Sequence, residues 1–588
     1  MGYGKRAVGT LGSVALGAEH ADLILVGCRL VNVYTREIQE GMQVAISGQR
    51  VAYVGYDASD TMASKTKVID ADGRLVAPGF AEPHMHIDQL VTPAEFSDRL
   101  LLCGTTSVFS DPIDIVGVAG YRGFREFLRL SSDLPIRIFN MIPGGLPVDT
   151  KFGNAGRLTP DEEREAVSLD GVLGLGEVFS WTKVTLQDPR TVSSLELMLY
   201  EDLVINGHTA GASDKKLQAY IASGVSSCHE PTTFEQVRER LRLGMWIMIR
   251  EGSIRRDLDE IVAGILSSDT GVERLMFCAD ELNPEDIGEY GHIDHCVRRA
   301  VSIGMKPADA VAIASRNCFE YYGMGRDLGG IAPGKLADII LFDQESFRPS
   351  TVIVGGNILV HDGSLVARAP RRTVPEWLRN TVRVPRLLPA DFVVPAKDDV
   401  VWVNTIHLIT EIVTRLNSQV LSVQNGSVQA SRDMDIWKVA AFDRTGKTKR
   451  RAVGFIENFG AGIDAFASTK NFHENDLVVI GMDDSSMALA ANHLIQSRGG
   501  MAVASGGRIV AEMPFEIGGI ISSGPFEKVL HEFKEVNQVI RDSGCVFQNP
   551  MLVPIFLPFL AIPSIRILHD GMVDVKKREF VPVIASGK

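Results

Sequence analysis

The stretch VAPGFAEPHMH (residues 76–86) decides the fold. It begins as a short apolar strand and ends in two histidines, His84 and His86, which are separated by one residue. Residues i and i+2 of a strand share one face, so both imidazoles can point at one centre. A doubly wound sheet would need a glycine-rich phosphate loop after its first strand. GFAEPHMH is not such a loop, so the stretch favours a different strand–helix architecture.

Residues 76–330 alternate strand-like runs with helical patterns such as DKKLQAYIASG and FEQVRERLRLG. Eight strand–helix units in about 250 residues are typical of a (β/α)8 TIM barrel. We therefore predict an α/β chain whose central part is such a barrel, with a doubly wound sheet as the structural alternative. The eight runs are VAPGFAEPHMH, TTSVFSDP, IRIFNMIPG, GVLGLGEV, LVINGHT, GVSSCHE, GMWIMIREG and LMFCADE.

Two β-rich stretches flank the barrel, at residues 22–75 and 331–370. Apolar and polar residues alternate in both, with Gly and Asp turns between the runs. We predict a small split β-sandwich domain into which the barrel is inserted, and the alternative is two unrelated small sheets. The remaining segments are predicted to be a mobile N-terminal tail (1–21), a Pro-rich linker (371–394) and a C-terminal α/β domain (395–588).

The composition excludes several classes of protein. The chain has 588 residues and a formal net charge of −13, which argues against a nucleic-acid backbone as the main partner. Its seven cysteines are scattered and form no CxxC pair, so a disulfide framework is excluded and a reducing, cytoplasmic compartment is predicted. Its apolar runs are shorter than the roughly 18 residues that cross a bilayer. We predict a small-molecule substrate and neither a nucleic-acid nor a membrane partner.

Side chains of metal-ligand type stand at the C-terminal ends of most of the predicted strands. Strand ends converge on one mouth of a barrel, where catalytic groups lie. Four imidazoles and two carboxylates suit zinc, iron or manganese. Each residue alone could instead have a structural role, as a hydrogen-bonded histidine, a helix cap or part of a turn. For the metal site to be absent, such roles would have to apply at five strand ends at once. The residues are His84, His86, Asp111, Asp114, Glu177, His208, His229 and Asp280.

In this order, the motifs PGFAEPHMH, GLGEV, INGH, SCHE and FCAD resemble the amidohydrolase superfamily. Within it, the chain most resembles the bacterial adenine deaminases. That likeness rests on CGTTSVFSDPIDIVGV, HEPTTFEQVRERLRLGMWIMIREGS, YGHIDHCVRRA and DLGGIAPGKLADIILFD. It extends into the C-terminal region through GFIENFGAGIDAFAS and MALAANHLIQSRGGMAVASGGRIVAEMPF, and it covers about residues 22–576.

The resemblance implies a metal-dependent aminohydrolase that converts adenine and water to hypoxanthine and ammonia. It implies a binuclear centre of divalent Mn, Fe or Zn, with one metal held by His84, His86 and Asp280 and the second by His208 and His229. Glu177 stands where many relatives carry a bridging carboxylated lysine, and a carboxylate can bridge two metals unmodified. Asp280 is expected to move the proton of the attacking water. The family is often oligomeric, which allows a homo-oligomer.

Glu230 directly follows a predicted ligand and is a candidate acid or substrate contact. The alternative for Glu230 is a cap on the helix that begins at Thr232-Thr233. Other candidate substrate contacts are Asp88, Asp111, Asp114 and Trp181, where core packing is the alternative for Trp181.

Three departures from the family pattern fall where specificity is expected. Adenine deaminases usually read HIES, DPHE and CTDD, and this chain reads HIDQ (86–89), DPID (111–114) and CADE (278–281). The changes at Asp88, Ile113 and Ala279 leave the predicted ligands intact. They keep open a second hypothesis, in which the same chemistry acts on a modified purine, another amino-heterocycle or an amide. A third hypothesis is a catalytically silent member that binds a ligand or partner, although the complete ligand set argues against it.

Overall fold

Eight parallel strands form the barrel that the sequence predicts, one for each strand-like run. The structure is a computed structural model that describes residues 8–343 and 346–585. Hydrogen bonds join five strands in the order β11-β10-β9-β8-β6 and three in the order β12-β13-β14, and a bridge between Met85 and Asp280 joins β6 to β14. The strands are β6 (Phe80–Met85), β8 (Thr105–Ser110), β9 (Arg137–Ile142), β10 (Val172–Val178), β11 (Val204–Gly207), β12 (Ser227–Cys228), β13 (Trp246–Arg250) and β14 (Leu275–Cys278).

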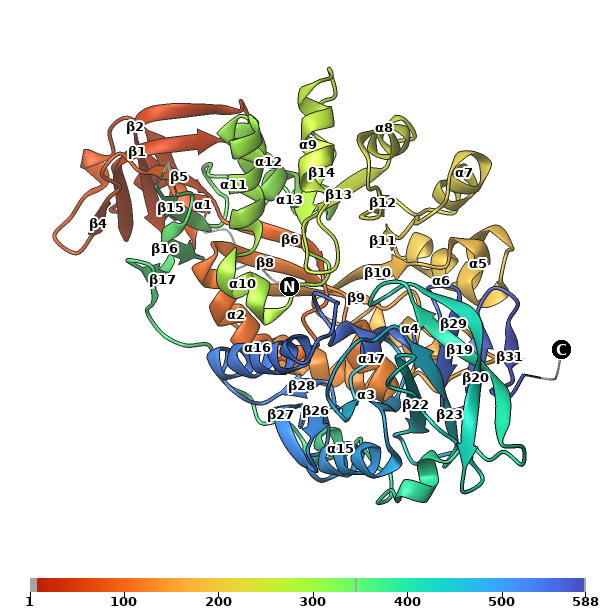
Figure 1. The fold of residues 1–588 in the computed structure, drawn as a ribbon. Helices are drawn as coiled ribbons and strands as arrows, with labels where there is room; N and C mark the ends of the chain where they lie inside the picture. Colours follow the sequence, from red (N-terminus) through yellow and green to blue (C-terminus); the bar gives the residue numbers. More distant parts are fainter. Residues whose placement is uncertain (1–7, 344–345, 586–588) are drawn as a thin grey trace.

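Helices follow the strands and surround the barrel (Figure 1). Several begin at a side-chain cap, which fixes where the preceding loop ends. Thr92, Thr159 and Thr233 each accept a hydrogen bond from a backbone N–H of the first turn. The helices are α2 (Pro93–Leu102), α3 (Ile113–Ser131), α4 (Pro160–Ala166), α5 (Trp181–Thr185), α6 (Pro189–Tyr200), α7 (Asp214–Ala222), α8 (Phe234–Arg242), α9 (Leu258–Leu266), α10 (Pro284–Glu289), α11 (Ile293–Ile303), α12 (Pro307–Ala314) and α13 (Arg316–Tyr321).

The segments before and after the barrel join in one sheet, of order β18-β17-β16-β15-β5-β1-β2-β3, with β4 paired to β1. The junction is an antiparallel pairing in which Ile339 lies opposite Pro78. Buried residues from both segments, among them Leu25, Val44 and Ile353, share one core, and Figure 1 shows the two segments side by side. The strands are β1 (Leu23–Asn32), β2 (Glu37–Ser47), β3 (Arg50–Gly55), β4 (Lys67–Asp70), β5 (Leu75–Pro78), β15 (Ile339–Phe342), β16 (Pro349–Val354), β17 (Asn357–His361) and β18 (Ser364–Leu365), with a 3-10 turn at Ser59–Thr61.

The N-terminal segment differs from the mobile tail that was expected for residues 1–21. Residues Val8–Ala15 form helix α1, and the side chain of Val14 is fully buried. It packs with Ile24, Ala45 and Ala52 on the face of the split sheet. Small side chains on that face let a short, weakly apolar helix approach closely. The low apolarity of residues 1–21 alone does not predict this packing. Residues 1–7 lie outside the described residues.

A second sheet of nine strands forms the C-terminal region, in the order β21-β20-β19-β23-β22-β25-β24-β26-β27. Helices α15 and α16 pack against it, and a short three-stranded sheet closes the chain. The strands are β19 (Val400–Leu408), β20 (Thr414–Gln424), β21 (Ser427–Val428), β22 (Ile436–Asp443), β23 (Arg451–Glu457), β24 (Ala465–Ser468), β25 (Asp476–Gly481), β26 (Gly500–Ser505), β27 (Arg508–Pro514), β29 (Ile565–Leu568), β30 (Gly571–Asp574) and β31 (Glu579–Val581). The helices are α14 (Glu376–Arg379), α15 (Asp484–Gln496), α16 (Phe526–Asp542) and α17 (Leu552–Phe556), with a 3-10 turn at Pro389–Phe392.

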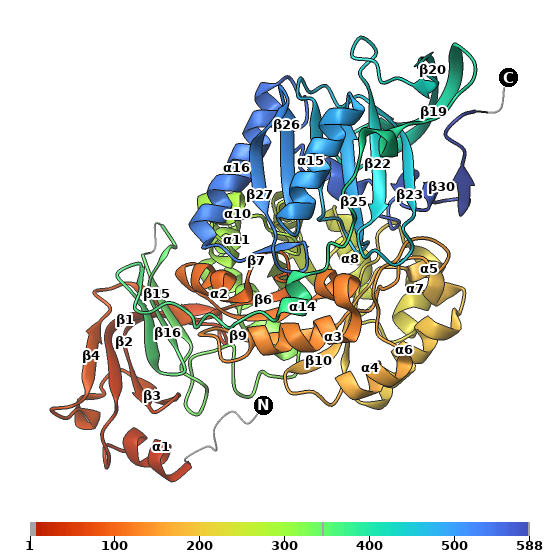
Figure 2. The ribbon, with the colours of Figure 1, turned by 90° about the horizontal axis from the view of Figure 1, so that it is seen from below.

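The C-terminal region is bound to the barrel through backbone and side chains. Strand β28 (Ile521–Ser522) pairs in parallel with β7 (Leu90–Val91), which follows His84 and His86 in the chain. The segment between β24 and β25 contacts the start of α3, where the Asn475 amide donates to the Gly117 carbonyl at 2.5 Å. In Figure 2 the C-terminal sheet, drawn in cyan to blue, stands over α2 and α3. One side of the barrel mouth is therefore covered by a segment about 350 residues further along the chain.

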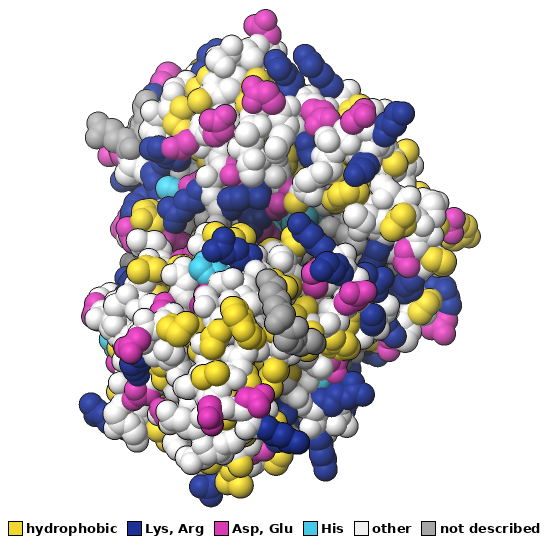
Figure 3. All heavy atoms as spheres, turned by 45° about the vertical axis from the view of Figure 1, so that its right-hand side comes forward, with side chains coloured by type: hydrophobic (Ala, Val, Ile, Leu, Met, Phe, Trp, Pro, Cys, Tyr) yellow, Lys and Arg dark blue, Asp and Glu magenta, His cyan; other side chains and the backbone are white. Residues whose placement is uncertain are grey.

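The surface carries both signs of charge. On the face drawn in Figure 3, acidic and basic side chains are interspersed and hydrophobic side chains lie scattered between them. The net charge of −13 is thus not gathered into one acidic patch on that face. Among residues 8–343 and 346–585, no helix combines the length and the apolarity that crossing a bilayer requires.

Candidate metal centre and active site

Strand β6 brings His84 and His86 to the mouth of the barrel, and both side chains are buried. The Nδ1 of His86 lies 2.7 Å from the Asp111 carbonyl oxygen, which can only accept a hydrogen bond. Nδ1 therefore carries the proton, and the lone pair of Nε2 is directed at the site, as in many metal-ligating histidines. That Nε2 lies 3.3 Å from Asp280 Oδ1 and 3.4 Å from Glu177 Oε1, and His84 Nε2 lies 3.1 Å from Asp280 Oδ1.

Glu177, His208 and His229 come from the ends of β10, β11 and β12 and form the other half of the cluster. His208 Nδ1 lies 2.8 Å from Glu177 Oε2 and 3.2 Å from His229 Nε2. His229 Nε2 lies 3.4 Å from the same Glu177 oxygen. Glu177 thus turns one oxygen toward His86 and the other toward His208 and His229. This is the placement that a carboxylate shared by two ligand groups requires.

The spacing of these atoms fits divalent transition-metal ions. A tetrahedral ion with bonds of about 2.1 Å holds its ligand atoms about 3.4 Å apart, and the distances among the six residues range from 2.8 to 3.4 Å. Imidazole and carboxylate donors suit zinc, iron and manganese alike. In the described part of the chain, three groups place their ligand atoms within 4.8 Å of one another: His84-Glu177-His229, His84-His86-Asp280 and His208-His229-Glu230.

Asp280 is fixed by the backbone of β6 and by Arg250. Its N–H donates to the His84 carbonyl and its carbonyl accepts from the His86 N–H, both at 3.1 Å, and its own backbone is left-handed with φ 60°. Burial alone would raise the pKa of the Asp280 carboxyl, but the adjoining Arg250 guanidinium and the imidazoles of the cluster hold it well below its usual range. Asp280 is therefore ionised in the metal-free protein.

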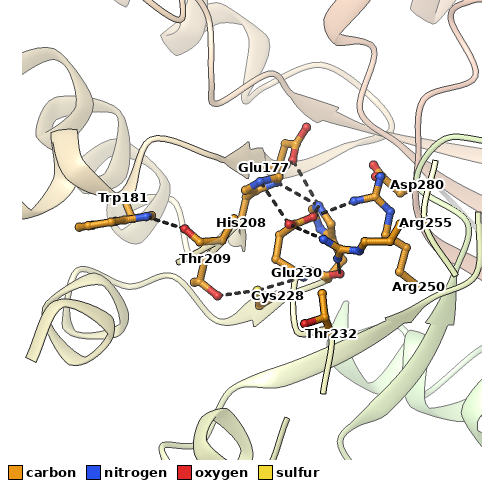
Figure 4. Close-up of polar contacts among 12 residues, drawn as sticks. Glu177, Trp181, His208, Thr209, Cys228, Glu230, Thr232, Arg250, Arg255 and Asp280 are labelled. Atoms are coloured by element: carbon orange, nitrogen blue, oxygen red, sulfur yellow. Dashed lines mark hydrogen bonds and ion pairs between the residues drawn. The ribbon is translucent and has the colours of Figure 1, made fainter. Parts of the chain in front are cut away.

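Glu230 is held by two arginines and does not cap a helix. Its Oε1 lies 2.7 Å from Arg250 and its Oε2 lies 3.0 Å from Arg255 (Figure 4). Thr233 caps α8 instead. Burial opposes ionisation, yet His208 and the two guanidinium groups lower the pKa of Glu230 to about 2. Since His208 Nε2 lies 3.7 Å from Glu230 Oε2, this ionised carboxylate borders the cluster.

The candidate substrate contacts occupy different places. Asp111 Oδ2 accepts from the Glu177 N–H at 2.8 Å, so its carboxylate supports a neighbouring strand end. Asp88 accepts from the Ile115 N–H at 2.7 Å, and Asp114 lies 3.1 Å from the Lys470 ammonium group. Trp181 lies beyond His208, apart from Glu230 and Asp280, and donates to the Ala210 carbonyl at 2.9 Å (Figure 4). The structure therefore groups the aspartates near His86 and leaves Trp181 outside the cluster.

Sequence reasoning missed three residues that border the site: Arg250, Lys470 and Glu82. Arg250 ends β13, and its position at a strand end was the signal that could have found it. Glu82 lies two residues before His84 on the same strand and accepts from the His84 and Ala279 N–H groups, both at 2.9 Å. Lys470 carries no local signal, because only the packing of the C-terminal region on the barrel brings it to Asp114.

Comparison with known proteins agrees with this architecture. The Amidohydrolase family model matches residues 75–359, and the Adenine deaminase C-terminal domain model matches residues 411–579. An adenine deaminase of Cenarchaeum symbiosum is 56% identical over 99% of this chain and 96% of its own length. Adenine deaminases of Moorella thermoacetica and Clostridium botulinum (strain Loch Maree) are 34% and 32% identical, each over 97% of this chain and 97% and 96% of their own lengths. The chain therefore belongs to the adenine deaminase family, within the amidohydrolases.

Proposed function

We propose that this protein is a metal-dependent hydrolase of C–N bonds that converts adenine and water to hypoxanthine and ammonia. The observation that carries the proposal is the convergence of four imidazoles with Glu177 and Asp280 at one barrel mouth. The identity to curated adenine deaminases over nearly the whole chain supports adenine as the substrate. We assign His84, His86, Glu177, His208, His229 and Asp280 as ligands of a binuclear site for Mn, Fe or Zn.

The residues around the site divide the chemical work. A divalent ion held by these residues would lower the pKa of its water, so that hydroxide, the attacking nucleophile, forms near neutral pH. Asp280, which is ionised, takes the proton from the attacking water and delivers it to the departing amine, so that ammonia leaves as a neutral molecule. Glu230, held by Arg250 and Arg255 beside His208, faces the cluster as a candidate substrate contact or acid. Arg250 holds both carboxylates in place.

A second candidate keeps the chemistry and changes the heterocycle. The departures from the family pattern at Asp88 and Ile113 favour it, because they lie close to His86 and leave the assigned ligands intact. Ammonia release from adenine separates the two candidates. Purified protein loaded with manganese should release ammonia from adenine, with ultraviolet spectra changing to those of hypoxanthine. Release from another amino-heterocycle but not from adenine would overturn the substrate and keep the chemistry.

Variants test the assigned roles. His208→Ala and Asp280→Asn should each lose nearly all turnover, since one removes a ligand and the other the proton acceptor, while the protein stays folded. His493→Ala is the matched control, because His493 is a partly exposed histidine on α15 that pairs with Glu512. It should keep wild-type turnover. An Asp280→Asn protein with wild-type turnover would remove Asp280 from the proton path.

We also propose that residues 22–75 with 331–370, 76–330 and 395–588 are the domains of the chain, joined by the linker 371–394. The split sheet and the C-terminal sheet each have a buried cluster of their own, which supports this division, although one larger buried cluster extends through all three parts. The seven cysteines are free thiols, which supports the cytoplasm as the compartment and purine metabolism there as the setting. A homo-oligomer stays a prediction.

A further inference from the structure

Lys470 is a buried ammonium group that the mechanism leaves unused. It lies on the segment between β24 and β25, and its side chain is only 2% exposed. Its Nζ lies 3.1 Å from Asp114 Oδ2 at the start of α3. An ammonium group has three N–H donors, and Asp114 is its one hydrogen-bond partner among residues 8–343 and 346–585. Burial of a charge with so few partners is costly unless a further acceptor is bound.

Unsatisfied polar atoms lie in the same region as this ammonium group. Asp114 Oδ1, Asp88 Oδ1 and His473 Nδ1 are all buried without a hydrogen-bond partner in the described residues. Buried polar atoms in native proteins are nearly always paired, with protein, water or ligand. The loop after β6, the start of α3 and the loop after β24 therefore present unpaired acceptors and donors in one region. A polar ligand with both donor and acceptor atoms would satisfy them.

The region adjoins the candidate metal centre. Asp88 is two residues from His86, and the Asp111 carbonyl that orients His86 is three residues from Asp114. Ring contacts also connect them: the Phe179 ring lies 6.4 Å from that of His208 and 5.6 Å from that of His473, between centroids.

The segment that carries Lys470 is held against the barrel. A Cβ on Gly117 of α3 would lie 3.2 Å from the His473 carbonyl oxygen, so glycine permits this close approach. Asn475 donates to the Gly117 carbonyl, and Glu474 accepts from the Asn154 N–H at 3.1 Å. The ammonium group is therefore held in place by several contacts at the barrel mouth.

A small cavity of about 40 Å³ lies beside Lys470, between the barrel and the C-terminal region. Gln89, Glu281 and Lys470 supply its polar wall, and Phe472 and Leu552 belong to its apolar wall. Pockets for small ligands have volumes of roughly 300–1,000 Å³ and combine apolar walls with a few convergent polar groups. At about 40 Å³ this cavity is smaller than such a pocket, so a flat heterocycle would fit beside Lys470 only after side chains of the apolar wall, such as Leu552, move aside.

We propose that Lys470 is a substrate-binding residue, supplied by the C-terminal domain, which donates a hydrogen bond to a ring nitrogen of the purine base. Asp88 and Asp114 accept from the N–H groups of the same base. The inference rests on the proposed deaminase function. It assigns to the C-terminal domain a part in recognising the substrate. The competing reading is that the Lys470–Asp114 pair only holds the two domains together.

The test combines a protein variant with substrate analogues. In Lys470→Met, assayed as full-length metal-loaded protein, KM for adenine should rise roughly tenfold to a hundredfold, the range expected for losing a charged hydrogen bond. In 3-deazaadenine and 7-deazaadenine one ring nitrogen is replaced by carbon. Wild-type protein should discriminate against the analogue that lacks the nitrogen Lys470 contacts. Lys470→Met should lose that discrimination, which a residue with a structural role alone would not affect.

Lys438→Met is the matched control. Lys438 is also buried, and its Nζ lies 2.6 Å from Asp484 Oδ1 within the C-terminal domain. Its loss should lower thermal stability and leave KM and the analogue preference unchanged. If Lys470→Met does not fold, Lys470→Met/Asp114→Asn removes both charges together, which buried pairs tolerate better than the loss of one partner. The double variant should likewise lose the analogue preference.

Two outcomes overturn the inference, and they are distinguishable. Wild-type protein that releases no ammonia from adenine refutes the proposed function and this inference with it. Active wild-type protein, together with a Lys470 variant that binds metal and retains the wild-type preference among the analogues, refutes the inference alone.

Discussion

Glu82→Gln should weaken the seam at which the barrel closes. Strands β6 and β14 are joined by the Met85–Asp280 bridge and two backbone hydrogen bonds. The Glu82 carboxylate, fully buried, strengthens this seam. It accepts from the His84 N–H on one side and the Ala279 N–H on the other, and His292 Nε2 lies 3.0 Å from its Oε2. The same contacts hold the backbone that carries His84, His86 and Asp280.

The expected loss of stability in Glu82→Gln follows from the number of acceptor atoms in each side chain. A glutamine has one acceptor oxygen, so one of the two backbone N–H groups would face an amide NH2. A hydrogen bond to a charged group contributes about 1.5–3 kcal/mol, and the surviving bond becomes a neutral one. We expect a loss of about 2–3 kcal/mol in the free energy of unfolding. For a domain of 150–250 residues, this corresponds to a fall in Tm of roughly 4–12 °C. Metal affinity should fall by about 10–100-fold, as for other groups that orient metal ligands.

Calorimetry of the metal-free protein measures the effect on the fold, and metal titration measures the effect on the site. Glu457→Gln is the control, because Glu457 is a buried carboxylate in the C-terminal sheet that accepts from Thr405, Asn417 and Gln419. It should lower stability and leave metal affinity unchanged. A Glu82→Gln protein with the Tm and the metal affinity of the wild type would refute the role given to Glu82.

Three further predictions concern other parts of the chain. Arg250→Met should lower kcat at least a hundredfold and Arg255→Met much less, because Arg250 contacts both Asp280 and Glu230 whereas Arg255 is partly exposed and does not contact Asp280; steady-state kinetics compare them. In His569→Gln, the free energy of unfolding should fall less at alkaline pH than it does in the wild type. Burial opposes protonation of His569, but Asp476 raises its pKa to about 9. The stabilisation from protonated His569 is therefore complete below about pH 6.5 in the wild type and is lost as the pH rises through about 9. Thermal unfolding from pH 6 to 10 measures this dependence. Trp181→Phe should change kcat/KM less than about twofold, because Trp181 lies outside the cluster.

The strands and the ligand cluster could be predicted because their signals are local. His84 and His86 share a strand face whatever the rest of the chain does, and a barrel brings all strand ends to one mouth. Lys470 and Asp114 are 356 residues apart, and no periodicity encodes the packing of two domains. Helix α1 was missed for a related reason: its stability depends on the small side chains of the sheet beneath it.

The distribution of charges around the site also lay beyond the sequence. A strand-end arginine such as Arg250 could have pointed to solvent, and only the fold places it between Glu230 and Asp280. Glu230 itself could have been a helix cap until Thr233 was seen in that position. Residue type and spacing thus predicted which side chains meet at the barrel mouth. The partners that set the ionisation of those groups came from contacts between strands.

The central claim is that the cluster of four histidines, Glu177 and Asp280 works through bound metal. Its most direct test is ammonia release from adenine by metal-free protein during titration with Mn²⁺, Fe²⁺ or Zn²⁺. We predict no turnover without metal, and a rise with added ion that saturates at one or two ions per chain. Full turnover by protein shown to be metal-free would contradict the claim.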